Sequence, residues 1–94
     1  INLLRQRAYG NSNGDVTSID LNFIIDERAR ELYWEGTRRT DLIRFGHYTG
    51  GSYLWPFKGG QPGGVALDAK FNVFPIPSAD IISNPNLVQN PNYN

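Results

Sequence analysis

The sequence predicts a mainly α-helical chain with long irregular loops and little β structure. Two observations support this fold class. Residues 26–46 are rich in helix-forming residues and contain no proline, so the central part of the chain is expected to be helical. Seven of the ten glycines then fall between residues 46 and 64, and a glycine-rich stretch of this length predicts a long loop.

The first residues are typical of the end of a helix. Leu3, Leu4 and Ala8 recur at helical spacing, and the turn-forming residues of the segment 10–15 then stop the helix. This turn segment lacks the carboxylate-rich pattern of a calcium-binding loop. We therefore expect a plain loop there.

A longer helix is predicted for the centre of the chain. Asp20 or Ser18 is a suitable N-cap for it. At roughly 100° per residue, one set of residues forms an apolar stripe along one side of this helix: Ile25, Ala29, Leu32, Gly36 and Ile43.

A second apolar stripe is expected on the opposite side. Phe23, Trp34 and Phe45 follow one another at intervals of eleven residues, close to whole helical turns. A helix that is apolar on two sides must be covered from both, so we expect this segment to be sandwiched inside a larger body. Gly36 offers an alternative, because it can end one helix and let another begin near Thr37 or Thr40.

The same segment carries equal numbers of acidic and basic side chains. Pairs at helical spacing are Asp26–Arg30, Glu27–Arg30, Glu31–Arg28 and Glu35–Arg39. We interpret the charges as a structural ion-pair network in which Glu27 and Arg38 are partly buried. The residues given a structural role are Glu27, Arg28, Glu31, Glu35, Arg38, Arg39, Asp41 and Arg44, together with Trp34.

A catalytic alternative for these carboxylates is a glycoside hydrolase that uses Glu27 or Glu31. Such an enzyme needs two carboxyl groups that face each other across a cleft. Here the glutamates run along one side of one predicted helix with arginines around them. This arrangement favours salt bridges over catalysis, and we expect no enzyme activity.

The glycine-rich loop contains the aromatic residues with the best case for ligand binding. Tyr53 and Trp55 have flat apolar rings with a polar edge, which suits stacking on a sugar. The alternative is that both rings fold back and anchor the loop. His47 is the only histidine and the chain has no cysteine, so we expect no metal site and no cofactor.

The last thirty residues are expected to contain a short extended run, a single helical turn and an irregular tail. Residues 65–74 alternate between apolar and polar side chains, which predicts a short strand-like run. Ser78 is a candidate cap for a single helical turn at 79–83, with Ile81 and Ile82 turned inward. The tail has no periodicity, and we expect its apolar residues Leu87, Val88 and Tyr93 to pin it to a larger body.

Three parts of the chain resemble motifs of a known family. E-R-x-x-E-L-x-x-E-G-x-R-R-x-D-L-I-R-F-G at residues 27–46 resembles the C-terminal signature of SusD/RagB-like proteins. L-R-x-R-A-Y at residues 4–9 is similar to the element that precedes this signature. F-P-I-P at 74–77, N-P-N-L at 84–87 and Q-N-P-x-Y at 89–93 are similar to the family's closing motifs. Asn92 stands where glycine is common and must therefore adopt the local turn.

The resemblance implies the C-terminal fragment of a SusD-like, tetratricopeptide-containing α-helical fold, with residues 1–94 as the end of a longer domain. Members are nutrient-binding lipoproteins of the bacterial outer-membrane surface. They bind oligosaccharide and deliver it to a SusC-like TonB-dependent transporter, without cleaving it. Some relatives bind peptide instead. The lipid anchor belongs to an N-terminus that we expect to lie outside this sequence, and the rest of the protein's own chain is an expected partner.

Composition agrees with a binding protein that does not act on nucleic acid. Nine acidic and nine basic residues give a formal net charge of zero, whereas nucleic-acid-binding proteins usually have a basic excess. No run of residues is long and apolar enough to cross a membrane.

Overall fold

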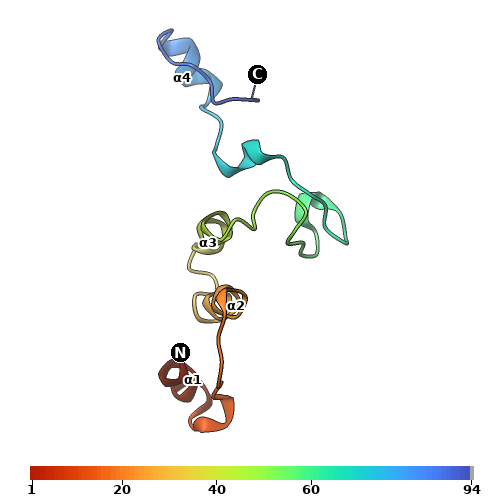
Figure 1. The fold of residues 1–94 in the computed structure, drawn as a ribbon. Coiled ribbons are helices and arrows are strands. Elements are labelled where there is room, and N and C mark those ends of the chain that lie inside the picture. The colour runs from red at the N-terminus through yellow and green to blue at the C-terminus, as the bar shows by residue number, and fades with distance from the viewer. Residues whose placement is uncertain (94) are drawn as a thin grey trace. The chain divides into compact units, whose positions relative to one another are not determined.

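The computed structural model describes residues 1–93 and consists of short helices joined by turns and loops (Figure 1). The four α-helices are α1 (Asn2–Tyr9), α2 (Leu21–Glu31), α3 (Arg38–Arg44) and α4 (Ser78–Ser83). The three 3-10 helices are η1 (Ser12–Gly14), η2 (Lys58–Gly60) and η3 (Ala69–Asn72). Residues 1–93 contain no strand, only an isolated antiparallel bridge between Gly50 and Leu67. The predicted mainly helical fold class is confirmed.

The chain divides into two compact units, and the first comprises Ile1–Glu35. Its helix α1 ends at Gly10, whose left-handed φ of 72° turns the chain while its N–H bonds to the carbonyl oxygen of Gln6. The predicted N-cap of the next helix is confirmed at Asp20, whose carboxylate accepts a hydrogen bond of 2.7 Å from the N–H of Phe23. Ile25 of α2 is fully buried.

A single helix through residues 26–46 is wrong, and the alternative of two helices is correct. Helix α2 ends at Glu31, residues 32–36 form a turn, and α3 begins just after Thr37. Gly36 supplies a left-handed φ of 75° in this turn. Trp34 lies in the turn and is 88 % exposed, so Phe23, Trp34 and Phe45 do not form one helical stripe.

The second unit begins at Gly36 and has a small core around α3. Leu42 and Asp41 of this helix are buried, and Lys58 of the following loop is buried as well. The strand-like run predicted for residues 65–74 is wrong from Ala69 onward, although Leu67 before it forms the antiparallel bridge to Gly50. The carboxylate of Asp68 accepts a hydrogen bond of 2.8 Å from the N–H of Lys70, and this local cap starts the 3-10 helix η3 in place of extended backbone.

The predicted helical turn near residue 79 is confirmed as α4, with two corrections. Ser78 lies inside the helix, while the N-cap position is Pro77 and carries no side-chain cap. Ile81 is half-buried, but Ile82 is 83 % exposed, so only one of the two points inward. Successive side chains of an α-helix point roughly 100° apart around its axis, so Ile81 and Ile82 of α4 face different directions.

The C-terminal tail is held by polar side chains of its own unit. The amide group of Gln89 makes two hydrogen bonds of 2.8 Å to the N–H and carbonyl oxygen of Ile76. Asn90 donates to the carbonyl oxygen of Phe74, and the hydroxyl of Tyr93 donates to that of Val73. Tyr93 thus holds the tail to its own unit and not to the larger body that was predicted, whereas Val88 is 84 % exposed.

Candidate functional site

The loop that follows α3 gathers four aromatic rings, and we call residues 47–67 the aromatic loop. The ring of His47 stacks on that of Tyr53, with centroids 4.6 Å apart and an interplanar angle of 9°. Trp55 lies between Tyr53 and Tyr48, at centroid distances of 6.2 Å and 6.3 Å. The structure therefore brings the two predicted stacking residues together.

The packing of these two rings supports an anchoring role. His47 covers one face of Tyr53, and the Tyr53 hydroxyl accepts a hydrogen bond of 3.1 Å from Nη2 of Arg38. Arg38 belongs to α3 and is half-buried, as predicted. A ring held by stacking on one side and by a hydrogen bond at its tip is fixed to the helix.

Lys58 organises the centre of the aromatic loop. Its Nζ atom donates hydrogen bonds to the main-chain carbonyl oxygens of Tyr53 (2.7 Å), Gly50 (2.9 Å) and His47 (3.3 Å). These three acceptors match the three N–H groups of an ammonium. The same Nζ lies 4.5 Å from the centroid of the Trp55 ring, close enough for a cation–π contact. Burial lowers the pKa of Lys58, because desolvation disfavours its charged form.

Glycine at position 64 is required by this packing. Its φ is 75°, and a Cβ atom there would lie 2.5 Å from the carbonyl oxygen of Trp55. The backbone of the loop closes on itself here, through a hydrogen bond of 3.1 Å from the N–H of Val65 to the carbonyl oxygen of Lys58. The loop was predictable from its glycines, but the role of Lys58 was not.

Arg39 links α3 to the C-terminal segment. The predicted partner was Glu35, but the guanidinium instead donates to the carbonyl oxygens of Phe71 (2.9 Å) and Asn72 (3.3 Å). Its Cζ atom also lies 3.9 Å from the ring centroid of Phe74 and 5.0 Å from that of Tyr48. Arg39 thus acts as a cross-link within the second unit, through main-chain acceptors and aromatic faces.

The first unit contains the ion pairs around Glu27. The predicted pair with Arg30 is confirmed at 2.7 Å, and Arg5 of α1 forms a second pair at 2.8 Å. The hydrogen bond from Arg30 and the charge of Arg5 hold the pKa of Glu27 below its ordinary value, against the opposing effect of burial. Glu31 pairs with Arg7 of α1. Only the contacts between neighbours on one helix could be predicted.

The other predicted network residues occupy different environments. Arg28 is half-buried on α2, and Glu35 is exposed in the turn after this helix. Asp41 is buried in α3, whereas Arg44 is exposed in the last turn of that helix. The predicted network residues therefore belong to two helices and the turn between them, and not to one helix.

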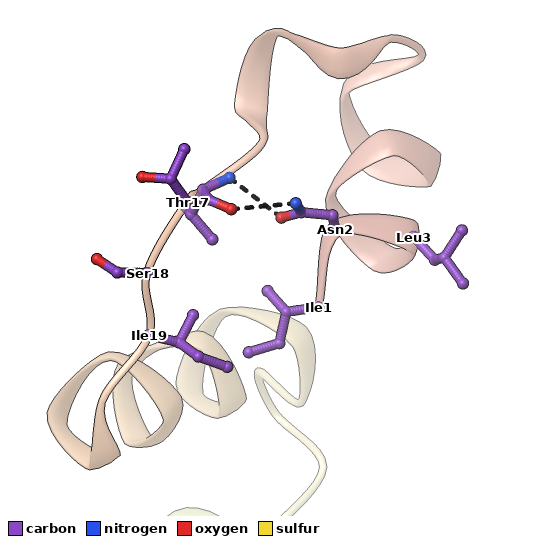
Figure 2. A pocket seen from close by; sticks show the side chains of 7 residues that line it. Ile1, Asn2, Leu3, Thr17, Ser18 and Ile19 are labelled. Carbon is purple, nitrogen blue, oxygen red and sulfur yellow. Dashed lines mark hydrogen bonds between the residues drawn. The ribbon is translucent and has the colours of Figure 1, made fainter.

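Two of the open hollows on the first unit share Ile1. One, of about 450 Å³, is lined by Ile1, Asn2, Leu3, Val16, Thr17, Ser18 and Ile19. Figure 2 shows the side chains of Ile1 and Ile19 pointing toward each other across it, while the Asn2 amide bonds to the backbone of Val16. The other, of about 330 Å³, is lined by Ile1, Leu4, Ile24, Glu27, Arg28, Glu31 and Leu32.

Neither a metal centre nor a membrane-spanning helix is found in the part of the chain that the structure describes. Residues 1–93 contain no group of three or more side chains of histidine, cysteine, aspartate or glutamate that could hold a metal ion. Within the same residues, no helix has the length and apolar character needed to cross a bilayer.

Comparisons with known proteins match almost the whole chain. Residues 1–93 match the model of the SusD family. The chain is also 46 % identical, over 93 residues, to the starch-binding protein SusD of Bacteroides thetaiotaomicron. This match covers 99 % of the present chain but 16 % of the relative, so the chain spans about one-sixth of the length of the relative that it matches.

Proposed function

The chain belongs to the SusD family, and we propose that it forms the C-terminal part of a cell-surface protein that binds nutrient oligosaccharide. The observation that carries this proposal is the 46 % identity to a protein named for starch binding. A starch-type α-glucan is therefore the first ligand to test. In this proposal the protein is lipid-anchored in the outer membrane and passes its ligand to a SusC-like TonB-dependent transporter.

Residues 1–94 act as the scaffold of that protein, and its ligand platform lies elsewhere. The rings of Tyr53 and Trp55 pack on neighbours in their own loop, and Lys58 holds the backbone beneath them. Arg39 and the amide of Gln89 then fasten the segment after the loop. These contacts support an anchoring role for the aromatic loop rather than stacking on a sugar.

The chemistry of Glu27 supports binding without bond cleavage. A glycosidase needs a general acid whose pKa is raised, so that it stays protonated near neutral pH. The pairs with Arg30 and Arg5 lower the pKa of Glu27, so this carboxyl group is ionised at neutral pH. Glu31 is paired with Arg7 as well. We propose that both glutamates hold helices together.

Calorimetry on the full-length protein tests this function. Titration with a maltooligosaccharide is expected to give saturable heat, and chromatography of the sugar afterwards is expected to show no shorter products. A set of oligopeptides serves as the alternative ligand. Saturable binding of peptide with no sugar binding would contradict the proposal, as would turnover of the sugar. Glu27→Gln is the matched variant, which is expected to bind sugar as the wild type does.

A further inference from the structure

The turn between α1 and α2 contains the one asparagine–glycine pair of the sequence, Asn13–Gly14. Asparagine is a chemically labile residue, and a following glycine offers no side chain to hinder attack of its main-chain nitrogen on the asparagine amide. Asn13 is exposed, and Gly14 is half-buried. The two groups that react in spontaneous deamidation are therefore adjacent, and the amide lies at the surface of its unit.

Packing requires glycine at position 14, although glycine favours this reaction. A Cβ atom there would lie 2.3 Å from Cδ2 of the Tyr9 ring. The guanidinium of Arg5 lies over the same ring, with Cζ 5.5 Å from the centroid, so the ring has a neighbour on that face. A larger residue that would slow the attack does not fit after Asn13.

Three side chains of α1 bond to the three successive residues that follow Asn13, and we call Asn2, Arg5 and Gln6 the α1 clamp. Its contacts are those of Arg5 to the Gly14 carbonyl oxygen, of Gln6 to the Asp15 carboxylate at 2.7 Å, and of Asn2 to the Val16 backbone, twice at 3.1 Å. The clamp fastens the 3-10 helix η1 to α1. Attack requires the Gly14 nitrogen to turn out of the helical conformation toward the Asn13 side chain, so the turn must first open locally.

We propose that Asn13 is a site of spontaneous deamidation and that the α1 clamp sets its rate in the folded protein. The main-chain nitrogen of Gly14 loses its proton and forms a bond to Cγ of Asn13, while the side-chain nitrogen takes up a proton and leaves as ammonia. Water then opens the cyclic succinimide at either of its carbonyl groups. The product is aspartate or isoaspartate, and no enzyme or oxidant is needed.

Isoaspartate would disturb the contacts of the turn. It lengthens the main chain just before Gly14, which moves the carbonyl oxygen that Arg5 binds. Arg5 also pairs with Glu27 of α2 at 2.8 Å, so it joins the turn to both helices of the first unit. The modification thus weakens the fastening of η1, and we expect the aged protein to have a lower Tm.

Peptide mapping of the full-length protein tests the site. The protein is aged in mildly alkaline buffer, natively and in guanidinium chloride, and mass spectrometry follows the conversion of each asparagine to the acid. In denaturant we expect Asn13 to react several-fold faster than Asn72, which precedes the branched Val73. In the native protein Asn13 is expected to react several-fold more slowly than in denaturant. Equal rates in either comparison would overturn the proposal.

Two arginine substitutions on α1 test the clamp. Arg5→Met removes the donor to the Gly14 carbonyl oxygen, so native deamidation of Asn13 is expected to become several-fold faster. Arg7→Met is the matched control, because Arg7 pairs with Glu31 instead, and we expect the wild-type rate. No acceleration in Arg5→Met, or the same acceleration in both variants, would overturn the role of the clamp.

Two further variants keep the test independent of the folding of Arg5→Met. Gln6→Met removes the exposed contact to Asp15 and is expected to speed native deamidation as well, by a smaller factor. Asn13→Gln has a longer side chain that closes the ring poorly, so its Tm is expected to stay constant during ageing while that of the wild type falls. An unchanged rate in Gln6→Met, or an equal fall in Tm in wild type and Asn13→Gln, would contradict the inference.

Discussion

The Nζ atom of Lys58 donates a hydrogen bond of 2.7 Å to the main-chain carbonyl oxygen of Tyr53, five residues earlier in the chain. Two further carbonyl oxygens of the same loop, those of His47 and Gly50, complete its three acceptors. The buried ammonium group of Lys58 thus holds the backbone of this glycine-rich loop together, in place of an apolar core. The position of the Tyr53 ring follows from this arrangement.

Lys58→Met is expected to loosen the aromatic loop. Methionine keeps the length and apolar stem but leaves three carbonyl oxygens without their donor. Since a hydrogen bond to a charged group contributes about 2 kcal/mol, the loss of even one such contribution predicts roughly thirtyfold faster exchange of the Val65 amide. Hydrogen exchange of the full-length protein measures this rate.

Lys70→Met is the matched control for this substitution. Lys70 has a single weak contact from Nζ to a carbonyl oxygen, that of Asn92 at 3.3 Å. We expect no change in the exchange of the Val65 amide. Equal effects of the two substitutions would show that Lys58 does not organise the loop.

Glu27→Gln is expected to destabilise the first unit at neutral pH by about 1 kcal/mol, because it weakens a partly buried pair with two arginines. The folded state lowers the pKa of Glu27, so its contribution is fully present above the ordinary value of 4.5. This contribution disappears as the pH falls through the lowered folded-state pKa. The difference in urea stability between wild type and variant should therefore shrink in acid.

Glu35→Gln provides the comparison for Glu27→Gln, since Glu35 is exposed in the turn after α2. We expect its stability to match the wild type within about 0.5 kcal/mol. A stability difference for Glu27→Gln that stays constant from neutral to acid pH would contradict the ion-pair account.

Gly64→Ala and Gly63→Ala form a pair of neighbouring substitutions with different outcomes. At Gly64 the φ is 75° and the new Cβ would meet the Trp55 carbonyl oxygen at 2.5 Å, so we expect a loss of about 1–3 kcal/mol. At Gly63 nothing lies within 4 Å, and we expect a change within about 0.5 kcal/mol. Urea unfolding measures both, and equal stabilities would contradict the described loop closure.

Gln89→Met is expected to release the C-terminal tail from the segment near Ile76. The side-chain amide of Gln89 accepts from the Ile76 N–H and donates to its carbonyl oxygen, each at 2.8 Å. Loss of about 1 kcal/mol per hydrogen bond should speed exchange of the Ile76 amide by roughly tenfold or more. Val88→Ala, at a residue 84 % exposed, should leave that exchange unchanged. Unaltered exchange in Gln89→Met would exclude the tail contact.

Local signals in the sequence predicted the parts of the fold that depend on neighbouring residues. The cap at Asp20 and the Glu27–Arg30 pair both span three residues and were confirmed. Asn92 was expected to adopt a turn conformation that glycine favours, and its φ is 67°. The sequence left two alternatives open at Gly36, one long helix or two shorter helices. The structure has two helices, with a break between them.

Contacts from a side chain to a distant main-chain carbonyl were not predictable. Arg39 bonds to Phe71 and Asn72, more than thirty residues away, and no residue pattern specifies such an acceptor. Lys58 was missed for the same reason, since every residue of its loop offers a carbonyl oxygen and the sequence does not say which three converge. The stripe through Trp34 failed because one left-handed residue in a turn ends the helical periodicity on which it depended.

Calorimetric titration of the full-length protein with a maltooligosaccharide is the most direct measurement of the central claim, that this chain is the scaffold end of an oligosaccharide-binding protein. We expect saturable heat, intact sugar afterwards, and the same affinity in Tyr53→Phe, which loses the hydroxyl contact to Arg38. The absence of saturable heat, or the release of shorter sugars, would contradict it.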